Sequence, residues 1–404
     1  MVDNAWVPFS HVFRPALVAV AVTAVVGLSP AAAGAAVVAS PSDIPADCSV
    51  DVTARLQAAI DTAPDGSTLQ LPTAACYRVD GTLVVKAKTN LTIDGRGTTI
   101  RQVTNGTELV GVNAIRSRSI WSFQQNTNVT LQDVIVRGAN PYAGLGDLAY
   151  SPKFEGQHAF VVAGGTNTVI QRVQAYDIFA DFVYAGPGVN GLLVRDSTFA
   201  RNGRQGWTIN GLNVTFDHNT ISDVHRSTVD LEPTYTSWVT RNVTVSNNTI
   251  GRGRGYFVAN QGQPYAPIDG VNIIGNRLIG KTMIIVVGGH VGQRNNYRVI
   301  GNTTDTPISA NGSGLHFNNV HGLEVRDNVA RAAFRHRYYG LTMWHSKDVT
   351  ISGNRWANAA GVWIDRGGNV NIRQSGNAIG TPIAVTPATA TVGPTPARVG
   401  GIPG

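Results

Sequence analysis

Short runs of alternating apolar and polar residues recur along most of this 404-residue chain. In Asn213–Asp217, for example, Val214 and Phe216 would leave one face of a strand and Thr215 the other. Equivalent runs are Asn90–Asp94, Asn128–Gln132, Asn167–Gln171, Gly191–Arg195, Asn242–Ser246, Val271–Gly275, Gly322–Arg326 and Asp348–Ser352. Most later runs are followed by an asparagine: Asn219, Asn248, Asn276, Asn302, Asn328, Asn354 and Asn377. These asparagines are 23 to 29 residues apart, a spacing typical of a β-solenoid.

A second strand is predicted roughly ten residues after each asparagine. The expected segments are Ala159–Gly164, Asp181–Gly186, Gly206–Gly211, Thr228–Pro233, Tyr256–Asn260, Met283–Gly288, Gly314–Asn319, Gly340–His345 and Gly361–Arg366. Trp207, Val229 and Ile284 are predicted to face inward on their coils. One coil cannot bury its own apolar side, whereas stacked coils bury a continuous core, and the repeated asparagine amides can bond from coil to coil. The pattern predicts an all-β fold of stacked coils with two or three sheets.

The chain before the repeats predicts one short helix. Val52, Leu56 and Ile60 recur at helical spacing, Ser49 or Asp51 is the expected N-cap, and Pro64-Asp65-Gly66 ends the pattern. Strands are expected at Thr68–Leu71 and Thr82–Val85.

Both ends of the chain differ in composition from the repeats. Residues 1–33 have the pattern of a signal peptide, in which Arg14 precedes an apolar run from Ala16 to Leu28 and small residues follow. That run is too short for a membrane span, and no other segment qualifies. We expect a secreted, extracellular protein without a membrane partner, with a linker at 34–47, a solenoid domain at 48–380 and a flexible tail at 381–404.

The net charge indicates the kind of partner to expect, and the cysteines indicate the redox compartment. The formal net charge of +7 favours an anionic partner such as an acidic glycan, although a basic secreted protein without one is the alternative. Nucleic acid is not expected, because the basic residues are spread along the coils without interleaved aromatics. Cys48 and Cys76 are expected to form a disulfide in an oxidising compartment, the alternative being two buried thiols.

The organisation resembles the right-handed parallel β-helix proteins of the pectate-lyase superfamily over roughly residues 48–380. Asp51–Asp61, Thr68–Pro72 and Leu91–Gly97 are similar to the opening segment of that family. The resemblance implies a right-handed parallel β-helix in which the N-terminal α-helix caps the open end. The resemblance does not indicate a particular activity, because this fold hosts lyases, hydrolases, epimerases, tailspikes and adhesins.

An acidic cluster is the first candidate for chemistry. Asp230 and Glu232 are two apart, so both leave the same face of their strand, while Val229 and Leu231 face the core. The stacking predicts Asp181 two coils away, with Asn210 on the coil between them. Paired carboxylates suit glycoside hydrolysis as acid and base or nucleophile. Two alternatives are salt bridges that only join coils and a Ca²⁺ site formed by the three carboxylates.

A basic column is predicted beside this cluster. Arg204, Arg226 and Lys281 each precede an expected inward residue by three positions, and Arg254 takes the same place under one alignment. A line of cations suits a linear polyanion, whereas the simpler explanation is pairing with nearby carboxylates or carbonyls. Elimination from a uronate would need a base and a cation, for which His225, Arg226 and Lys281 are candidates. Tyr235 and Trp238 are expected to line a sugar cleft.

These features predict a secreted enzyme that cleaves an acidic polysaccharide, either a glycoside hydrolase or a polysaccharide lyase. The alternative is a non-catalytic glycan-binding or surface protein of the same fold. The expected catalytic residues are Asp230, Glu232, Asp181, His225 and Arg226. The expected substrate-binding residues are Arg204, Asn210, Arg254, Lys281, Tyr235 and Trp238. No cofactor is required by this chemistry, and the sequence does not indicate an oligomeric state.

Overall fold

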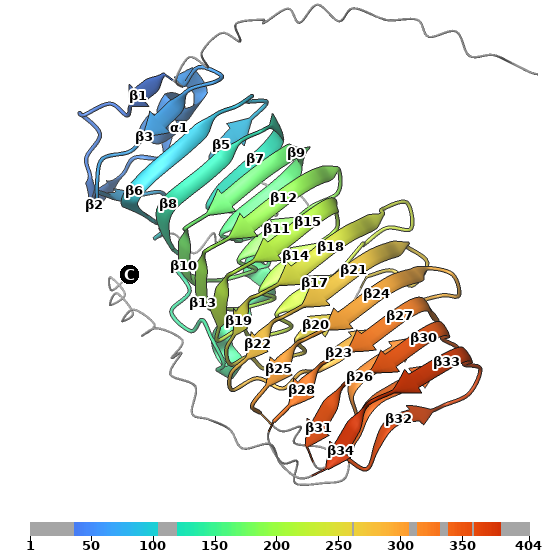
Figure 1. Cartoon of the computed structure of the whole chain (residues 1–404). Helices are drawn as coiled ribbons and strands as arrows, with labels where there is room; N and C mark the ends of the chain where they lie inside the picture. The colour runs from blue at the N-terminus through green and yellow to red at the C-terminus, as the bar shows by residue number, and fades with distance from the viewer. Residues whose placement is uncertain are drawn as a thin grey trace, which may run out of the picture. The chain divides into compact units, whose positions relative to one another are not determined.

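The structure, a computed structural model, describes residues 36–103, 119–260, 262–306, 313–331, 338–357 and 359–380. Between Ala36 and Gly380 the described strands pair in parallel and stack as successive coils of a solenoid (Figure 1). The predicted signal peptide and the predicted tail lie outside the described residues. Within the described part of the chain, no helix is long and apolar enough to cross a membrane.

Three parallel sheets, here named I, II and III, form the sides of the solenoid. Sheet I contains β1 (Val37–Ala39), β3 (Thr68–Gln70), β6 (Thr92–Arg101), β8 (Thr130–Arg137), β9 (Phe160–Gln171), β12 (Val189–Arg195), β15 (Leu212–Asp217), β18 (Thr240–Ser246), β21 (Ile268–Ile274), β24 (Arg294–Ile300), β27 (Val320–Arg326), β30 (Lys347–Ser352) and β33 (Val370–Ser375).

Sheet II continues from the second halves of β6 and β8. It contains β2 (Asp47–Asp51), β4 (Cys76–Arg78), β10 (Gln174–Ile178), β13 (Thr198–Asn202), β16 (Thr220–Ser222), β19 (Thr249–Ile250), β22 (Arg277–Leu278), β25 (Thr303–Thr304), β28 (Val329–Ala330), β31 (Arg355–Ala357) and β34 (Ala378–Gly380).

Sheet III, which carries the acidic strand, includes the first half of β9. It contains β5 (Leu83–Lys86), β7 (Trp121–Thr127), β11 (Val183–Ala185), β14 (Trp207–Ile209), β17 (Val229–Leu231), β20 (Val258–Ala259), β23 (Ile285–Val287), β26 (Ser313–Asn318), β29 (Tyr339–Trp344) and β32 (Gly361–Asp365). Every predicted second strand therefore overlaps an observed one.

The interior is a single apolar column. Val214 and Phe216 are fully buried, as their alternation predicts, and Trp207 stacks on Phe216 with ring centroids 4.4 Å apart. The same core cluster runs from Ile44 to Trp356. One register prediction is wrong, because Ile285 and not Ile284 pairs with Val258 at the inward position.

The predicted asparagine ladder is confirmed and buried along most of its length. Asn276 shows the repeating unit: its main-chain N–H donates to the Asn302 side-chain oxygen at 3.0 Å, and its amide donates to the same oxygen at 2.9 Å and to the Val245 carbonyl at 2.8 Å. The ladder joins Asn219, Asn248, Asn276, Asn302, Asn328, Asn354 and Asn377. The left-handed conformation belongs to the residue before each asparagine, such as His218 or Gly275, and not to the ladder residue.

The N-terminal end is closed by α1 (Thr53–Thr62), whose Leu56 and Ile60 enter the core. The helix N-cap is Val52, so the prediction of Ser49 or Asp51 is wrong, although the Asp51 carboxylate accepts from the Thr53 N–H at 3.0 Å. The predicted linker 34–47 is also corrected, because β1 within it pairs with β3.

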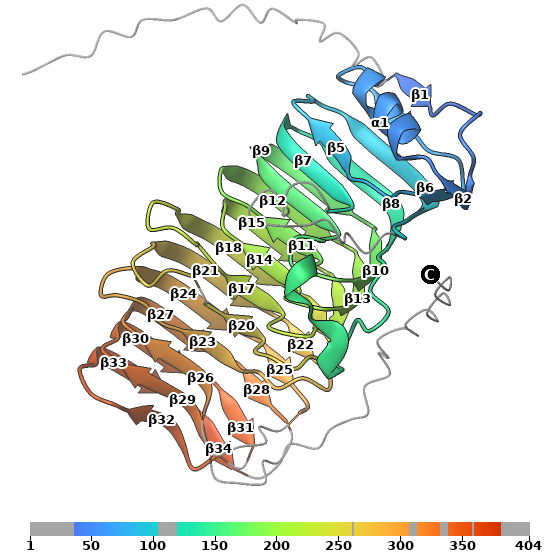
Figure 2. The ribbon, with the colours of Figure 1, turned by 180° about the vertical axis from the view of Figure 1, so that it is seen from behind.

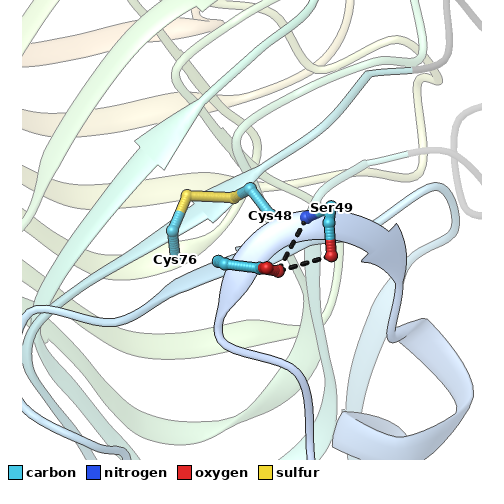
Figure 3. The surroundings of a disulfide bond; sticks show 4 residues. Cys48, Ser49 and Cys76 are labelled. Carbon is cyan, nitrogen blue, oxygen red and sulfur yellow. Dashed lines mark hydrogen bonds between the residues drawn. A yellow bond between two sulfur atoms is a disulfide. The ribbon is translucent and has the colours of Figure 1, made fainter.

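The predicted disulfide is present near this end. Cys48 in β2 is bonded to Cys76 in β4, 28 residues later, and Ser49 beside it donates to the carboxylate of Asp47 (Figure 3). In the chain-entropy model a crosslink of this length stabilises the fold by roughly 3 kcal/mol. A disulfide is typical of exported proteins.

Candidate functional site

The predicted acidic strand lies in the middle of sheet III. Tyr184 in β11, Thr208 in β14 and Asp230 in β17 are register partners on three successive coils. The residues beside them, such as Trp207 and Val229, are fully buried in the core. Because side chains alternate along a strand, the three polar residues belong to the outward face of the sheet.

Asp181 lies two residues before β11 and is fully buried. Its carboxylate accepts from the Arg204 guanidinium at 2.8 Å, the Thr208 hydroxyl at 2.8 Å and the Gln205 N–H at 2.9 Å. Burial raises the pKa of Asp181, and the charge of Arg204 and these hydrogen bonds oppose that rise. These contacts fix the position of the Arg204 guanidinium beside the outward-facing Thr208 of sheet III.

Arg204 joins three carboxylates. Besides Asp181, its Nη2 lies 3.3 Å from the Glu232 oxygens and its Nε lies 3.7 Å from Glu155. Burial alone would lower the pKa of Arg204, but the surrounding carboxylates hold it above its ordinary value. The contact of Arg204 with Glu232 agrees with the salt-bridge alternative, and its contacts with Asp181 and Glu155 are additions that the sequence did not reveal.

Glu232 is partly accessible to solvent, since 23% of its side chain is exposed, whereas Asp181 is fully buried. Burial raises its pKa to about 7; the charges of Asp230 and Asp181 add to the rise and Arg204 opposes it. Glu232 borders an open pocket of about 150 Å³ that is also lined by Thr234, Gly262, Gln263 and Pro264. A carboxyl group with this pKa can accept or donate a proton near neutral pH.

Asp230 and Asn210 are less accessible than the sequence predicts. Asp230 is fully buried and accepts from the Gln205 amide at 2.9 Å. Asn210 is also buried, and we assign its amide the orientation in which nitrogen faces the Glu232 and Ile209 carbonyls. Neither side chain is at the surface, which does not favour the expected contact of Asn210 with substrate.

His158 is a buried neighbour that no sequence signal identifies. Its Nδ1 accepts from the Asp181 N–H at 3.2 Å, and burial lowers its pKa to about 3. The imidazole is therefore neutral, and its 3.5 Å approach to the Asp181 carboxylate is not an ion pair. Its ring packs against Tyr184, whose pKa burial raises to about 12.

The insertion between β8 and β9 borders the site at the beginning of the strands. It contains two short 3₁₀ helices, η1 (Asp147–Ala149) and η2 (Pro152–Phe154), which are the green turns beside the sheet in Figure 2. The Arg226 guanidinium lies 3.9 Å from the centre of the Tyr150 ring in this insertion. The His225 ring lies parallel to the same ring, and burial lowers the pKa of His225.

The predicted basic column is not continuous. Arg204 and Arg226 keep equivalent places, but Lys281 and Arg254 lie one residue earlier relative to the strand register. Lys281 is buried and donates to the Gly255 carbonyl, while Arg254 pairs with Asp147 on the insertion. Arg226 is therefore the column member whose guanidinium lies on an aromatic ring.

The predicted aromatic pair lies at the opposite end of the strand. Tyr235 and Trp238 follow β17 and pack edge to face with ring centroids 4.9 Å apart. Tyr235 is 56% exposed, so it can contact a ligand beside Glu232.

The alternative of a Ca²⁺ site is not supported. Arg204 bonds to both Asp181 and Glu232, and the part of the chain that the structure describes holds no group of three or more His, Cys, Asp or Glu residues arranged for a metal. The arrangement suits proton transfer at Glu232 better than metal binding.

Two family models match the sequence. One, described as the right-handed β-helix region, matches residues 119–304, which carry the site. This match agrees with the parallel strand pairing of the described coils, so the fold is a right-handed parallel β-helix. The other model, described as periplasmic copper-binding protein, matches residues 265–382 of this β-helix. No curated protein sequence matches the chain.

Solved structures share the β-helix at low sequence identity. The A-module of a mannuronan C-5 epimerase from Azotobacter vinelandii is 16% identical, with a TM-score of 0.55 over 85% of this chain and 95% of that one. A surface adhesin of Streptococcus pneumoniae is 13% identical, with a TM-score of 0.61 over 86% and 92%. An endo-xylogalacturonan hydrolase from Aspergillus tubingensis is 12% identical, with a TM-score of 0.53 over 86% and 93%. These identities establish a shared fold only.

Proposed function

We propose that this β-helix is a secreted enzyme that cleaves a polysaccharide bound along the outer face of β11, β14 and β17. The observation that carries the proposal is Glu232, a partly exposed carboxyl group with a pKa near 7 at the edge of a pocket. Groups with such a pKa are effective general acids and bases at neutral pH.

Glu232 is the proton-transfer group in this proposal, and Asp230 is a fully buried second carboxylate that acts by raising the pKa of Glu232. In hydrolysis, protonated Glu232 would donate its proton to the leaving glycosidic oxygen, and the carboxylate left behind would take a proton from the water that adds to the anomeric carbon. In elimination, ionised Glu232 or His225 would remove the proton beside a uronate carboxyl that Arg226 neutralises. The C=C bond would then form as the glycosidic C–O bond breaks, and the leaving oxygen would take a proton from water. Asp181 acts as a positioning residue, because it holds Arg204 against Glu232.

The names of two similar structures support a glycan substrate. One is an epimerase of mannuronan and another is a hydrolase of xylogalacturonan. The formal net charge of +7 favours an acidic glycan at long range. Close to Glu232, however, carboxylates outnumber guanidinium groups, because Asp181, Asp230 and Glu155 surround Arg204. The expectation of an acidic substrate therefore rests on the net charge of the whole chain and not on the residues around Glu232.

The test is to incubate the purified protein with uronate and neutral glycans, and to follow reducing ends together with absorbance from new C=C bonds. Reducing ends without unsaturation identify a hydrolase, and both together identify a lyase. Glu232→Gln and Asp230→Asn should each lower turnover by at least about 100-fold while the far-ultraviolet circular dichroism stays unchanged. Full activity in both variants would contradict the assignment.

A non-catalytic glycan-binding protein is the second candidate. It is favoured by the burial of Asp181 and Asp230 and by the three-carboxylate pairing of Arg204, which also suits a structural network. A similar structure is a surface adhesin. Binding to a glycan without any product would select this candidate over the enzyme.

A further inference from the structure

One side of the Glu232 pocket is formed by residues 262–266, here called the wall. The wall is attached to the segment that follows Glu232, because the Gln263 N–H donates to the Pro233 carbonyl at 2.8 Å. Gly262 packs so closely on Pro233 that an added Cβ would lie 2.5 Å from the proline ring. The loops that contain residues 233–239 and the wall leave the same edge of the solenoid, beside β18 and β21 in Figure 1.

Arg294 holds the wall in place through hydrogen bonds to its main chain. This guanidinium is fully buried, and it donates to the Ala266 carbonyl at 2.5 Å, the Gln263 carbonyl at 3.2 Å and the Asn260 side chain at 2.5 Å. A buried cation is costly unless its donors are satisfied. Here carbonyl and amide oxygens of the wall region satisfy them, so the wall and Arg294 stabilise one another and the loop is held in one conformation.

The wall presents an aromatic face to solvent. Tyr265 is 56% exposed, and its ring stacks on the exposed ring of His290 with centroids 4.6 Å apart. The His290 N–H also donates to the Pro264 carbonyl at 2.9 Å, which ties the two loops together. A large aromatic ring kept at the surface of a fixed loop beside a pocket is a typical contact for the C–H face of a sugar.

We propose that the wall is a glycan subsite in which Tyr265, supported by His290, stacks on an uncharged pyranose ring next to Glu232. The ring is uncharged because the described residues that line the pocket are Glu232, Thr234, Gly262, Gln263 and Pro264, none of which is basic. A uronate carboxylate placed there would meet a carboxyl group and no cation among these residues. This inference rests on the proposed function, and it assigns Arg294 as the residue that positions the subsite.

The experiment measures binding of cellotetraose, mannotetraose and tetragalacturonate to the full chain by isothermal titration calorimetry. Tyr265→Ala should weaken binding of a neutral tetrasaccharide about 3- to 10-fold, and Tyr265→Phe should restore it, because the ring carries the contact. Val370→Ala is the control, since Val370 is 55% exposed but lies on β33, the last strand of sheet I. It should leave binding unchanged.

The outcomes separate the two proposals. If the wild type binds a neutral tetrasaccharide and Tyr265→Ala binds it equally well, the subsite is overturned while the proposed function stands. If tetragalacturonate is the tighter ligand and depends on Tyr265, the uncharged ring is overturned. If the wild type binds none of the three, both proposals are overturned. Arg294→Lys should reproduce the loss seen in Tyr265→Ala, and unaltered binding in that variant would contradict the positioning role.

Discussion

At the residue scale, the acidity of Glu232 is set by opposing neighbours. Burial and the charges of Asp230 and Asp181 favour its protonated form, whereas Arg204 favours the carboxylate. Asp181 also holds one nitrogen of Arg204 at 2.8 Å, so it competes with Glu232 for that cation. The candidate site therefore works as one electrostatic unit and not as two independent carboxylates.

Replacing Asp181 with asparagine should move the pKa of Glu232 toward acid. The change removes a negative charge and leaves Arg204 more available to the Glu232 carboxylate. Carbon-13 NMR titration of the glutamate carboxyl groups measures the shift directly. Asp177→Asn is the control, because Asp177 is likewise paired with an arginine, Arg201, but lies on sheet II. A pKa of Glu232 that stays in place or rises would contradict this account.

The same pKa predicts how stability depends on pH. The folded protein keeps the Glu232 proton up to about pH 7, whereas an ordinary glutamate releases it near 4.5. Between these values the folded state binds more protons, so the free energy of unfolding falls as pH rises, by up to roughly 3 kcal/mol. Below this window the contribution is complete.

Urea unfolding of wild type and Glu232→Gln from pH 4 to pH 8 measures this dependence. The variant should lack the fall between about pH 4.5 and 7, because glutamine does not titrate. Identical pH dependence in the two proteins would show that Glu232 has an ordinary pKa.

At the element scale, the periodic parts of the fold were predictable and the irregular parts were not. The asparagine spacing predicted the coils, since a buried amide that bonds to its own copy must recur once per coil. The strand register was predicted wrongly at Met283–Val287. This segment is apolar throughout, so alternation cannot decide whether Ile284 or Ile285 faces the core. That error placed Lys281 in a surface column when it is buried.

The site was predictable only where it lies on the strands. Asp230 and Glu232 follow from alternation, and Arg204 from its place before β14. Glu155 and His158 belong to the insertion and its junction with β9, where no repeat relates a residue to its neighbours in space. Gln205 contacts Asp230 through a turn conformation that the apolar pattern does not encode.

The ladder itself gives a prediction about stability. Asn276→Ala should lower the free energy of unfolding by roughly 2–5 kcal/mol, because it leaves buried partners on both adjacent coils without their hydrogen bonds. Asn272→Ala in the same coil is the control: that side chain is partly exposed and makes one long hydrogen bond of 3.4 Å to Thr244. Thermal unfolding of the two variants should separate them clearly, and equal stability would show that the ladder contributes little.

At the scale of the whole molecule, two electrostatic features oppose each other. The chain carries a formal net charge of +7, which attracts polyanions over distances up to the screening length. The cluster around Glu232 has the opposite balance, with several carboxylates around Arg204. A polyanion would therefore be drawn to the protein as a whole without being stabilised at the pocket, whereas a neutral glycan would respond to neither field.

Salt dependence distinguishes these two kinds of ligand. Between 20 and 500 mM NaCl, binding of homogalacturonan should weaken at least about 5-fold, because added salt screens the long-range attraction. Binding of a neutral glycan such as glucomannan should change less than about 2-fold, because aromatic stacking carries no net charge. Affinity electrophoresis at each salt concentration measures both in one format. A uronate polymer whose binding survives high salt would show that cations contact it directly. Arg226→Ala would then identify whether the half-buried guanidinium over Tyr150 is one of them.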